Sequence, residues 1–479
     1  MDVVNKKCIF NYSEVTSKTI QFLPKKCDTV CAILTFNSNT DLTESQLREG
    51  LKTMKYLTGS LKIENSTLKT LNIFANDKYG GDVSFYCEGG EISIKNNSML
   101  EDVSIFQDIY VWGDDFTREC PVRMENNPKL DTTEVCEMGS FREWIGIRTS
   151  GNLKDCGCYG GLITSSESLR TFENCTTLYG GLKFLNFSAS DDLKFLSNLE
   201  DIRGNLEIQN TNFKDLSFLR NLKKLQSMKP LDGKNIAINI RKNPEMTTLG
   251  FESLEDLFDA QSDETTVNLE NLHPELCLSF KEVYVFLYMH IKLKNAQAKY
   301  CQNSEKVNRN DLNVCEFKNF DSLGDNCEFI FGDILIDSYD GKFLWKLYGV
   351  RVIFGSLKIQ YTKLDALSFL QNLMFIANLN DTNPAVLIRS NKYLKQAKFP
   401  YLEHVISRSG KYVEVYDNPV LFENNQECLM YRITYKTNVR VKNEDCDRNA
   451  YSMPSNYQDS PRKVIILIIG ISFLKKLSE

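Results

Sequence analysis

The sequence predicts a mainly β protein made of three consecutive short right-handed β-solenoids, each closed by helical, disulfide-bonded caps. Three observations lead to this fold class. A motif of glycine, a Leu-x-Ile triplet, a polar corner and a leucine occurs three times, roughly 150 residues apart. Strand-like segments that end in asparagine recur around each motif at intervals typical of one solenoid turn. Cysteines stand at matching places around all three copies.

The repeated motif explains how each turn would fold. Its copies are GSLKIENSTLKTL at Gly59, GNLEIQNTNFKDLSFLRNL at Gly204 and GSLKIQYTKLDALSFLQNL at Gly355. Because side chains alternate along a strand, we expect each Leu and Ile in the solenoid interior and the residue between them on an outward parallel sheet. The glycine permits a corner with positive φ. An asparagine after the strand tolerates a left-handed bend, and its amide can bond the backbone of the next turn.

Further strand-like segments extend each copy into a stack of four strand–turn units. Before the motif come AILTF at Ala32, GGLKF at Gly180 and GDILI at Gly332. After it come ISIKNNSML at Ile92, INIRKNPEM at Ile238 and VLIRSNKYL at Val386, and then VRMENNPKL at Val122, VNLENLHPEL at Val267 and VEVYDNPVL at Val413. We therefore expect three domains over residues 1–156, 157–301 and 315–446, a polar linker over 447–463 and an apolar tail over 464–479.

The cysteines predict two bridges per module, one at each open end of a solenoid. The chain has 15 cysteines, and stapling a cap over an open end would cover apolar interior and unpaired strand edges. The expected pairs are Cys8–Cys27, Cys136–Cys156, Cys158–Cys175, Cys277–Cys301, Cys315–Cys327 and Cys428–Cys446. Cys87 can meet Cys120 across neighbouring turns, which leaves Cys31 as a buried thiol in its strand. Disulfides predict an oxidising compartment; the alternative is a cytosolic protein with inert buried thiols.

Charge and motif content exclude several function classes. The net charge of -6 gives no basic face for nucleic acid. No C-x-x-C or H-x-x-x-H spacing predicts a metal site, and we expect no cofactor. The chain has only three histidines, His273, His290 and His404. His290 lies in the apolar run VYVFLYMHIKL, which we interpret as the closing helix of the second module with a structural histidine.

The two ends of the chain bear on its location. The first seven residues lack the basic and apolar regions of a secretory leader, so either the true start lies upstream or the chain is cytosolic; the cysteines favour the first. The apolar residues 464–474 (VIILIIGISFL) would rise only about 16 Å as a helix, too short to cross a bilayer comfortably. We interpret them as a truncated membrane anchor or lipid-anchor signal that could attach the chain to a membrane, with a final buried strand as the alternative. N-glycosylation sequons occur at Asn11, Asn65, Asn96, Asn174, Asn186 and Asn380.

Taken together, these segments resemble the receptor L domain of the insulin and EGF receptor families, a leucine-rich-repeat-like solenoid. The resemblance is carried by CTTLYGGLKF from Cys175, by the strands at Gly204 and Gly355, and by the module ends after Asn271 and Asn418. It extends over nearly the whole chain. Those receptors place a cysteine-rich region between two L domains, whereas only residues 302–314 separate the second and third modules here. The chain also lacks kinase motifs, so it is most similar to kinase-less proteins with repeated L domains.

The resemblance implies a function and a candidate surface. In the insulin receptor, hormone lies on the outward sheet of the first L domain, and the matching positions here are Lys62, Glu64, Ser93, Lys95, Arg123 and Glu125. These residues are mostly charged, which favours a polar partner over an insulin-like hormone with apolar anchors.

We therefore expect a non-catalytic extracellular or cell-surface glycoprotein that acts as a decoy or co-receptor. Its partner would be a secreted peptide, insulin- or EGF-like, or a receptor ectodomain. The alternatives are a structural matrix or coat protein and, less favoured, a polysaccharide-acting β-helix enzyme. No turn gathers three carboxylates outward for the latter.

Overall fold

The computed structural model describes most of the chain. The described residues are 6–75, 83–87, 90–107, 111–113, 120–137, 147–227, 236–259, 265–301, 314–380, 382–436, 438–441 and 444–446. The expected linker over 447–463 and apolar tail over 464–479 lie outside them. By compactness the chain divides into two units, residues 1–243 with 250–267, and residues 244–249 with 268–479. The protein is mainly β, with parallel sheets and few helices, as the sequence predicts.

The first parallel sheet has eight strands and branches at a long bent strand. Its main order is β1-β2-β3-β5-β7-β8, with β4 paired to β3 and β6. The first half of β3 pairs with β4 and the second half with β5, so two ladders diverge at Gly59, where φ is 127°. The strands are β1 (Ile9–Phe10), β2 (Thr29–Phe36), β3 (Tyr56–Glu64), β4 (Ser84–Cys87), β5 (Ile92–Lys95), β6 (Val111–Gly113), β7 (Val122–Glu125) and β8 (Ile147–Ser150).

The second sheet repeats this arrangement around β10. Within the first unit its order is β15-β13-β11-β10-β12-β14, with β9 also paired to β10. The boundary between the units falls inside β16 (Thr266–Leu272), and β18 (Lys292–Lys294) follows in the second unit. The other strands are β9 (Cys158–Ile163), β10 (Thr177–Leu185), β11 (Asp201–Arg203), β12 (Leu206–Gln209), β13 (Lys224–Ser227), β14 (Ile236–Asn243) and β15 (Asp256–Asp259). A two-stranded sheet joins β17 (Cys277–Leu278) to β19 (Lys299–Tyr300).

The last part of the chain forms two separate ladders. A five-stranded parallel sheet contains β20 (Val314–Glu316), β21 (Phe329–Phe331), β23 (Val352–Phe354), β25 (Phe375–Asn378) and β27 (His404–Ser407), in that order. A six-stranded sheet contains β22 (Ile334–Ile336), β24 (Leu357–Gln360), β26 (Val386–Arg389), β28 (Val413–Tyr416), β29 (Asn438–Val441) and β30 (Glu444–Asp445). Four successive turns each contribute one strand to each sheet, namely the pairs β21 and β22, β23 and β24, β25 and β26, and β27 and β28. In the described part of the six-stranded sheet, β29 and β30 pair antiparallel, and the other strand pairs are parallel.

Helical elements are short and lie between strands or at the ends of the ladders. Among the described residues the α-helices are α1 (Glu44–Leu51), α2 (Thr133–Glu137), α4 (Phe280–Tyr288) and α5 (Asn425–Tyr435). Helix α4 contains only the first part of the run interpreted as a closing helix; His290 follows the helix with a φ of 55°, and the end of the run lies in β18. The 3₁₀ turns are η1 (Lys6–Cys8), η2 (Ile20–Phe22), η3 (Asn72–Phe74), η4 (Ser104–Gln107), η5 (Glu167–Phe172), η6 (Asp191–Leu196), η7 (Ser217–Leu219), η8 (Asp340–Leu347) and η9 (Ser368–Leu370).

The Leu-x-Ile triplets form the interior as expected. Their leucine and isoleucine side chains are at most 1% exposed in all three copies, namely Leu61, Ile63, Leu206, Ile208, Leu357 and Ile359. The middle residues, Lys62, Glu207 and Lys358, are half-buried on the opposite face. Neighbouring triplets lie in register, so these apolar pairs stack from turn to turn. The division into three closed solenoid modules remains a prediction.

The left-handed bend and the hydrogen bonds to the next turn, both expected of a single corner asparagine, are divided between two successive residues. The first adopts the left-handed conformation, with φ between 52° and 57° at Asn65, Asn96, Asn126, Asn186, Asn210 and Asn271. The second is buried and bonds the neighbouring turns, as Asn97, Asn127, Asn243, Asn391 and Asn418 do. For example, Asn127 Nδ2 donates to the carbonyl of Ile94 at 3.0 Å, and its Oδ1 accepts from the backbone N–H of Asn97 at 3.0 Å. These bonds satisfy backbone groups that each corner would otherwise bury unpaired.

Seven disulfides join the described residues. Six are the pairs expected from the spacing, with Cα–Cα distances between 4.9 and 6.0 Å, and the seventh joins Cys87 to Cys120 at 5.3 Å. All these distances fall within the usual range for disulfides. Cys31 takes no part in them, and it is half-buried in β2 rather than buried. Ile33, two residues further on, is exposed, because side chains alternate along β2 and Ile33 lies on the side opposite the buried Leu34.

Candidate ligand-binding surface

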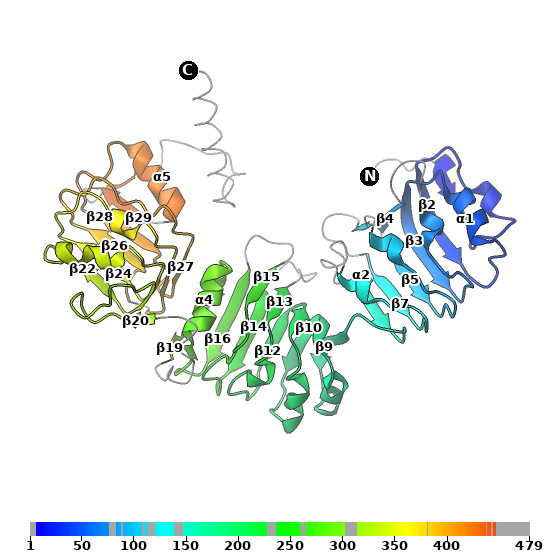
Figure 1. Cartoon of the computed structure of the whole chain (residues 1–479), viewed down its shortest axis with the longest axis horizontal. Helices are drawn as coiled ribbons and strands as arrows, with labels where there is room; N and C mark the ends of the chain where they lie inside the picture. The colour runs from blue at the N-terminus through cyan, green and yellow to red at the C-terminus, as the bar shows by residue number, and fades with distance from the viewer. Residues whose placement is uncertain are drawn as a thin grey trace, which may run out of the picture. The chain divides into compact units, whose positions relative to one another are not determined.

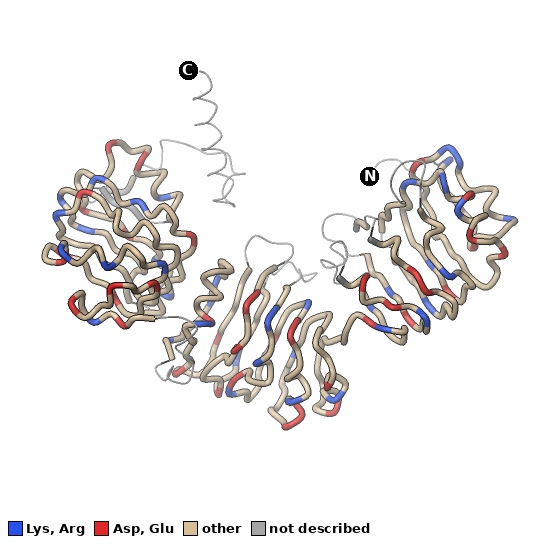
Figure 2. The backbone as a smooth tube through the Cα atoms, in the orientation of Figure 1, with Lys and Arg blue, Asp and Glu red and all other residues tan. Residues whose placement is uncertain are grey.

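The register of β3, β5 and β7 brings the six expected binding residues together in two rows. Lys62, Ser93 and Arg123 lie opposite one another in the first row. Glu64, Lys95 and Glu125 form the second. Figure 1 shows these three strands side by side, and Figure 2 shows acidic and basic residues intermixed along them. We call this set the first outward face.

Most side chains of the first outward face bond one another. Lys95 Nζ lies 2.9 Å from a carboxylate oxygen of Glu125. The hydroxyl of Ser93 donates to Glu64 at 2.6 Å. Ser93 is only 1% exposed, so the expectation that it offers surface to a ligand is wrong. It is covered because it lies between the longer Lys62 and Arg123 in its row and is tied to Glu64 in the next.

Glu91 belongs to this face although the motif comparison missed it. Its two carboxylate oxygens lie 3.8 Å from Lys62 Nζ and 3.8 Å from Arg123 Nε. The alternation of side chains could have found it, since Glu91 stands two residues before Ser93 and so shares its side of the strand. All three side chains are between 33% and 41% exposed, so each contact contributes less than about 1 kcal/mol. The face is thus a charge-balanced lattice suited to polar contacts.

The matching face of the second sheet is built in the same way. Lys183 Nζ lies 2.6 Å from a carboxylate oxygen of Glu207, which also faces Arg241 at 3.9 Å. Arg241 in turn donates to the side chain of Gln209 at 2.7 and 3.0 Å. Charges on this face therefore also compensate one another.

The six-stranded sheet presents a chemically different face. In its first row Lys358 lies between Leu335, which is 42% exposed, and Leu387. Within the described residues no carboxylate pairs with Lys358. In the second row the guanidinium of Arg389 donates to Gln360 at 2.8 Å and to the hydroxyl of Tyr416 at 3.4 Å. The hydrogen bond from Arg389 to Tyr416 raises the pKa of this guanidinium further above its usual value, so it stays charged.

Arg389 also faces an exposed aromatic ring. Its guanidinium carbon lies 5.7 Å from the ring centre of Tyr361, a side chain 58% exposed at the corner after β24. Cations and aromatic rings together are typical of protein-binding hot spots. We call the set of Leu335, Lys358, Arg389, Tyr361 and Tyr416 the third outward face.

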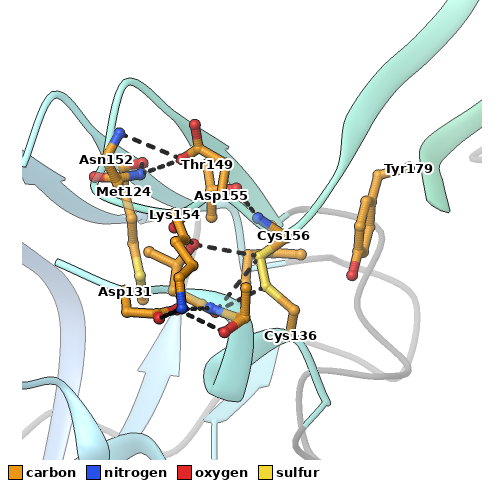
Figure 3. The surroundings of a disulfide bond; sticks show 12 residues. Met124, Asp131, Cys136, Thr149, Asn152, Lys154, Asp155, Cys156 and Tyr179 are labelled. Carbon is orange, nitrogen blue, oxygen red and sulfur yellow. Dashed lines mark hydrogen bonds and ion pairs between the residues drawn. A yellow bond between two sulfur atoms is a disulfide. The ribbon is translucent and has the colours of Figure 1, made fainter. Parts of the chain in front are cut away.

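A disulfide fixes the end of the first sheet. Cys136 in α2 is bonded to Cys156 beyond β8, and Figure 3 shows Asp131 and Lys154 pointing toward one another beside this bridge. Lys154 Nζ donates to Asp131 at 2.7 Å, and the backbone N–H of Thr133 donates to the other carboxylate oxygen at 3.0 Å. These bonds, that from Lys154 above all, lower the pKa of Asp131 to about 2.

A buried arginine links the end of the first sheet to the second. Arg203 is 7% exposed, and its Nη1 donates to the hydroxyl of Tyr179 at 2.8 Å and to the carbonyl of Cys136 at 2.9 Å. The neighbouring phenol of Tyr159 donates to the carbonyl of Ile147 and accepts from the N–H of Thr149 at 2.8 Å. Burial raises the pKa of Tyr159, so its hydroxyl remains a donor. These bonds hold the first two sheets in one compact unit.

All six sequon asparagines have exposed side chains. Asn65, Asn96 and Asn186 occupy left-handed corners that directly follow a strand. Asn65 and Asn96 follow Glu64 and Lys95, so they border the first outward face. Exposure satisfies the first requirement for glycosylation at each site.

Neither a membrane-spanning helix nor a metal cluster is found in the described part of the chain. No helix there is long and apolar enough to cross a bilayer. Nor do three or more His, Cys, Asp and Glu side chains gather there in a way that could hold a metal ion.

Comparison with known proteins agrees with the resemblance seen in the sequence. The receptor L-domain model matches residues 174–288 and 326–439, which contain β10 to β14 and β21 to β28. Protein irld-34 of Caenorhabditis elegans is 24% identical over 317 residues, which cover 60% of this chain and 76% of that protein. Receptor L domains are non-catalytic ligand-binding domains. The chain therefore contains two segments, residues 174–288 and 326–439, that match the receptor L-domain family.

Proposed function

We propose that this protein is a non-catalytic extracellular or cell-surface binding protein made of three short solenoid modules, over residues 1–156, 157–301 and 315–446. It would recognise a secreted peptide or a receptor ectodomain and act as a decoy or co-receptor. The observation that carries the proposal is the repeated outward sheet. Two of its copies lie in the receptor L-domain matches, and the first sheet has the same branched ladder around a glycine corner.

The disulfides support the proposed location. Seven disulfides tie strands and caps together across the described residues. Such bridges form and persist in oxidising compartments and are rare in the cytosol. The six exposed sequons are consistent with passage through the same compartment.

The first outward face is the proposed contact surface for a polar partner. Its binding residues would be Lys62, Glu64, Lys95, Arg123 and Glu125, with Glu91 added. A parallel sheet is rigid, so its side chains lose little conformational entropy on binding. A charge lattice that is already ordered gives specificity through complementary potentials more than it gives raw affinity.

The third outward face is a second candidate, for a different reason. There the cations Lys358 and Arg389 lie beside Leu335 and two tyrosines, with no carboxylate paired to Lys358 in the described structure. Such a face fits a partner that combines acidic and apolar side chains. The third outward face would supply the apolar anchors that the first outward face lacks.

Charge reversal separates the two faces. We would measure binding of the full chain to a panel of secreted peptides and receptor ectodomains, comparing K62E/K95E/R123E with K358E/R389E. The variant of the contacting face should lose at least about tenfold in affinity, while thermal melting shows that both variants remain folded. If the panel contains a binder whose affinity neither variant changes, both outward faces are excluded. If nothing in the panel binds, that result favours the alternative of a structural matrix or coat protein. Turnover of acidic polysaccharide would instead favour the enzyme alternative.

A further inference from the structure

A cleft of about 380 Å³ opens at the corner between the five-stranded and six-stranded sheets. Its walls include Tyr300, Phe331, Phe354, Leu379, Asn380 and Arg408, all within the second compact unit. Two turns of the chain corner at glycines that line the cleft. Gly332 and Gly355 have φ values of 129° and 152°, and a Cβ atom at these positions would meet the backbone oxygens of Phe317 and Gly332, respectively.

One wall of the cleft is aromatic and fixed. Tyr300 donates its hydroxyl to the carbonyl of Ala377 at 2.6 Å. Its ring centre lies 5.4 Å from that of Phe331 and 6.0 Å from that of Phe354. Burial of the phenol raises the pKa of Tyr300 well above its usual value, so the donor is kept. The wall is therefore formed before anything binds against it.

The cleft lining also includes a sequon asparagine, Asn380, in a defined conformation. Asn380 Oδ1 accepts from the backbone N–H of Thr382 at 2.9 Å and from its hydroxyl at 2.7 Å. The backbone N–H of Asn380 donates to Asn378 Oδ1 at 2.9 Å, and Asn378 Nδ2 donates to the carbonyl of Asn383 at 2.9 Å. With the side-chain oxygen occupied by Thr382, the amide nitrogen has no hydrogen-bond acceptor among the described residues and is available for substitution.

We infer that Asn380 carries an N-linked glycan whose first sugar lies in this cleft, against the aromatic wall of Tyr300 and Phe331. One face of an N-acetylglucosamine ring presents only C–H bonds and suits an aromatic surface. Its hydroxyl and acetamido groups need polar partners, and Arg408 and Asp333 are among the residues that line the cleft. A concave, mostly apolar site with a few polar groups is the usual setting for a bound small molecule. The other five sequons do not line this cleft.

The attachment reaction needs a lipid-diphosphate-linked oligosaccharide and the transferase that uses it. The amide nitrogen of Asn380 bonds to C1 of the first sugar and loses a proton to the transferase. The C1–O bond breaks, and the lipid diphosphate leaves with the electron pair. The inference thus rests on the proposed extracellular location, since this donor is met in the secretory pathway.

Secretion of the full chain from a eukaryotic cell line, followed by glycopeptide mapping, tests the inference. Asn11 serves as the matched site because its side chain is exposed and does not line the cleft. We expect both sites to be occupied. A glycan amidase should release the Asn380 glycan from the native protein at least about fivefold more slowly than the Asn11 glycan, and at equal rates after denaturation, because the cleft shields the core sugar.

Sequon variants give a second, independent readout. T382A removes the Asn380 sequon, whereas T382S keeps it; S13A and S13T do the same at Asn11. We expect T382A to melt at a lower temperature than T382S, with no difference between S13A and S13T. Equal release rates at the two sites in the native wild-type protein would overturn the seating of the sugar even if T382A fails to fold. Occupancy at Asn11 without occupancy at Asn380 would overturn the inference and leave the proposed location standing; no occupancy anywhere would overturn both.

Discussion

The guanidinium of Arg203 donates to the main-chain carbonyl of Cys136, 67 residues earlier in the chain, at 2.9 Å. The same group donates to the hydroxyl of Tyr179 at 2.8 Å, lies 5.0 Å from the centre of that ring, and pairs with Asp201 at 3.0 Å. One side chain thus ties the disulfide-bonded end of the first sheet to two strands of the second. The planar fork of arginine can serve these partners at once, which a lysine cannot.

Replacing Arg203 with alanine should destabilise the first compact unit by about 2–4 kcal/mol, because it leaves the Cys136 carbonyl and the Asp201 carboxylate without their donor. R203K should lie between wild type and R203A. Denaturant unfolding of the full chain measures both.

The matched control for this prediction is R241A. Arg241 lies on the second sheet and faces Glu207 at 3.9 Å, with 40% of its side chain exposed. Its loss should cost less than about 1 kcal/mol. Equal destabilisation by R203A and R241A would show that the buried contacts of Arg203 contribute no more to the free energy of unfolding than the exposed contacts of Arg241.

Asn391 should be one of the least replaceable residues of the six-stranded sheet. It is fully buried; its Oδ1 accepts from the N–H of Thr362 at 3.0 Å, and its Nδ2 donates to the carbonyl of Ile359 at 3.0 Å. N391A would leave both backbone groups buried without partners, so we expect a loss of about 2–4 kcal/mol in unfolding free energy. The control is N372A, which removes a single bond from an exposed asparagine to the carbonyl of Tyr348. If N391A unfolds at the same denaturant concentration as N372A, the ladder does not stabilise the corner.

Gly355 should not tolerate alanine. Its φ of 152° is rarely adopted by residues with a side chain, and a Cβ atom there would overlap the carbonyl oxygen of Gly332. Strain of this kind costs about 1–3 kcal/mol before any clash is counted. G341A is the control, because nothing lies within 4 Å of a Cβ at Gly341. We expect thermal melting to separate the two variants clearly; a G355A protein as stable as G341A would contradict the corner geometry.

Much of this fold could be predicted from sequence because the signals are local. The alternation in Leu-x-Ile fixes which side chains are buried, and the glycine before it marks the corner. Matching cysteine positions give the six pairs because neighbouring turns bring them together. The prediction did not separate the corner into a left-handed residue and a buried ladder asparagine. Asn126 and Asn127 are the same residue type. Only their backbone conformation and burial distinguish the left-handed corner residue from the buried residue that bonds the neighbouring turns.

The candidate surface was predicted less completely, because it depends on contacts between turns. The predicted strand register could place Lys62, Ser93 and Arg123 in one row. It could not show that the two longer side chains cover Ser93. The bridge by Glu91 also depends on how long side chains bend. The contrast with the face around Lys358 and Arg389 could not be foreseen, since their partners come from other turns.

Acid should weaken the end of the first sheet through Asp131. The bonds from Lys154 and Thr133 lower the pKa of this carboxyl from 3.8 to about 2 in the folded protein. The unfolded chain therefore takes up a proton first as the pH falls. The resulting stabilisation is fully present above pH 3.8 and is lost as the pH falls from 3.8 toward 2.

Solvent screens this pair, since 36% of the Asp131 side chain and 65% of the Lys154 side chain are exposed, so the contribution should be below about 1 kcal/mol. We expect D131N to be less stable than wild type at pH 7 by that amount and the difference to shrink as the pH falls from 3.8 toward 2. Urea unfolding at several pH values measures this change, and a double-mutant cycle with K154M isolates the pair. The carboxylate has no stabilising role if D131N matches wild type at pH 7. A deficit that persists undiminished at pH 2 would instead assign the effect of D131N to packing or to the Thr133 bonds, because the wild-type carboxylate is by then partly protonated and its charge should contribute less.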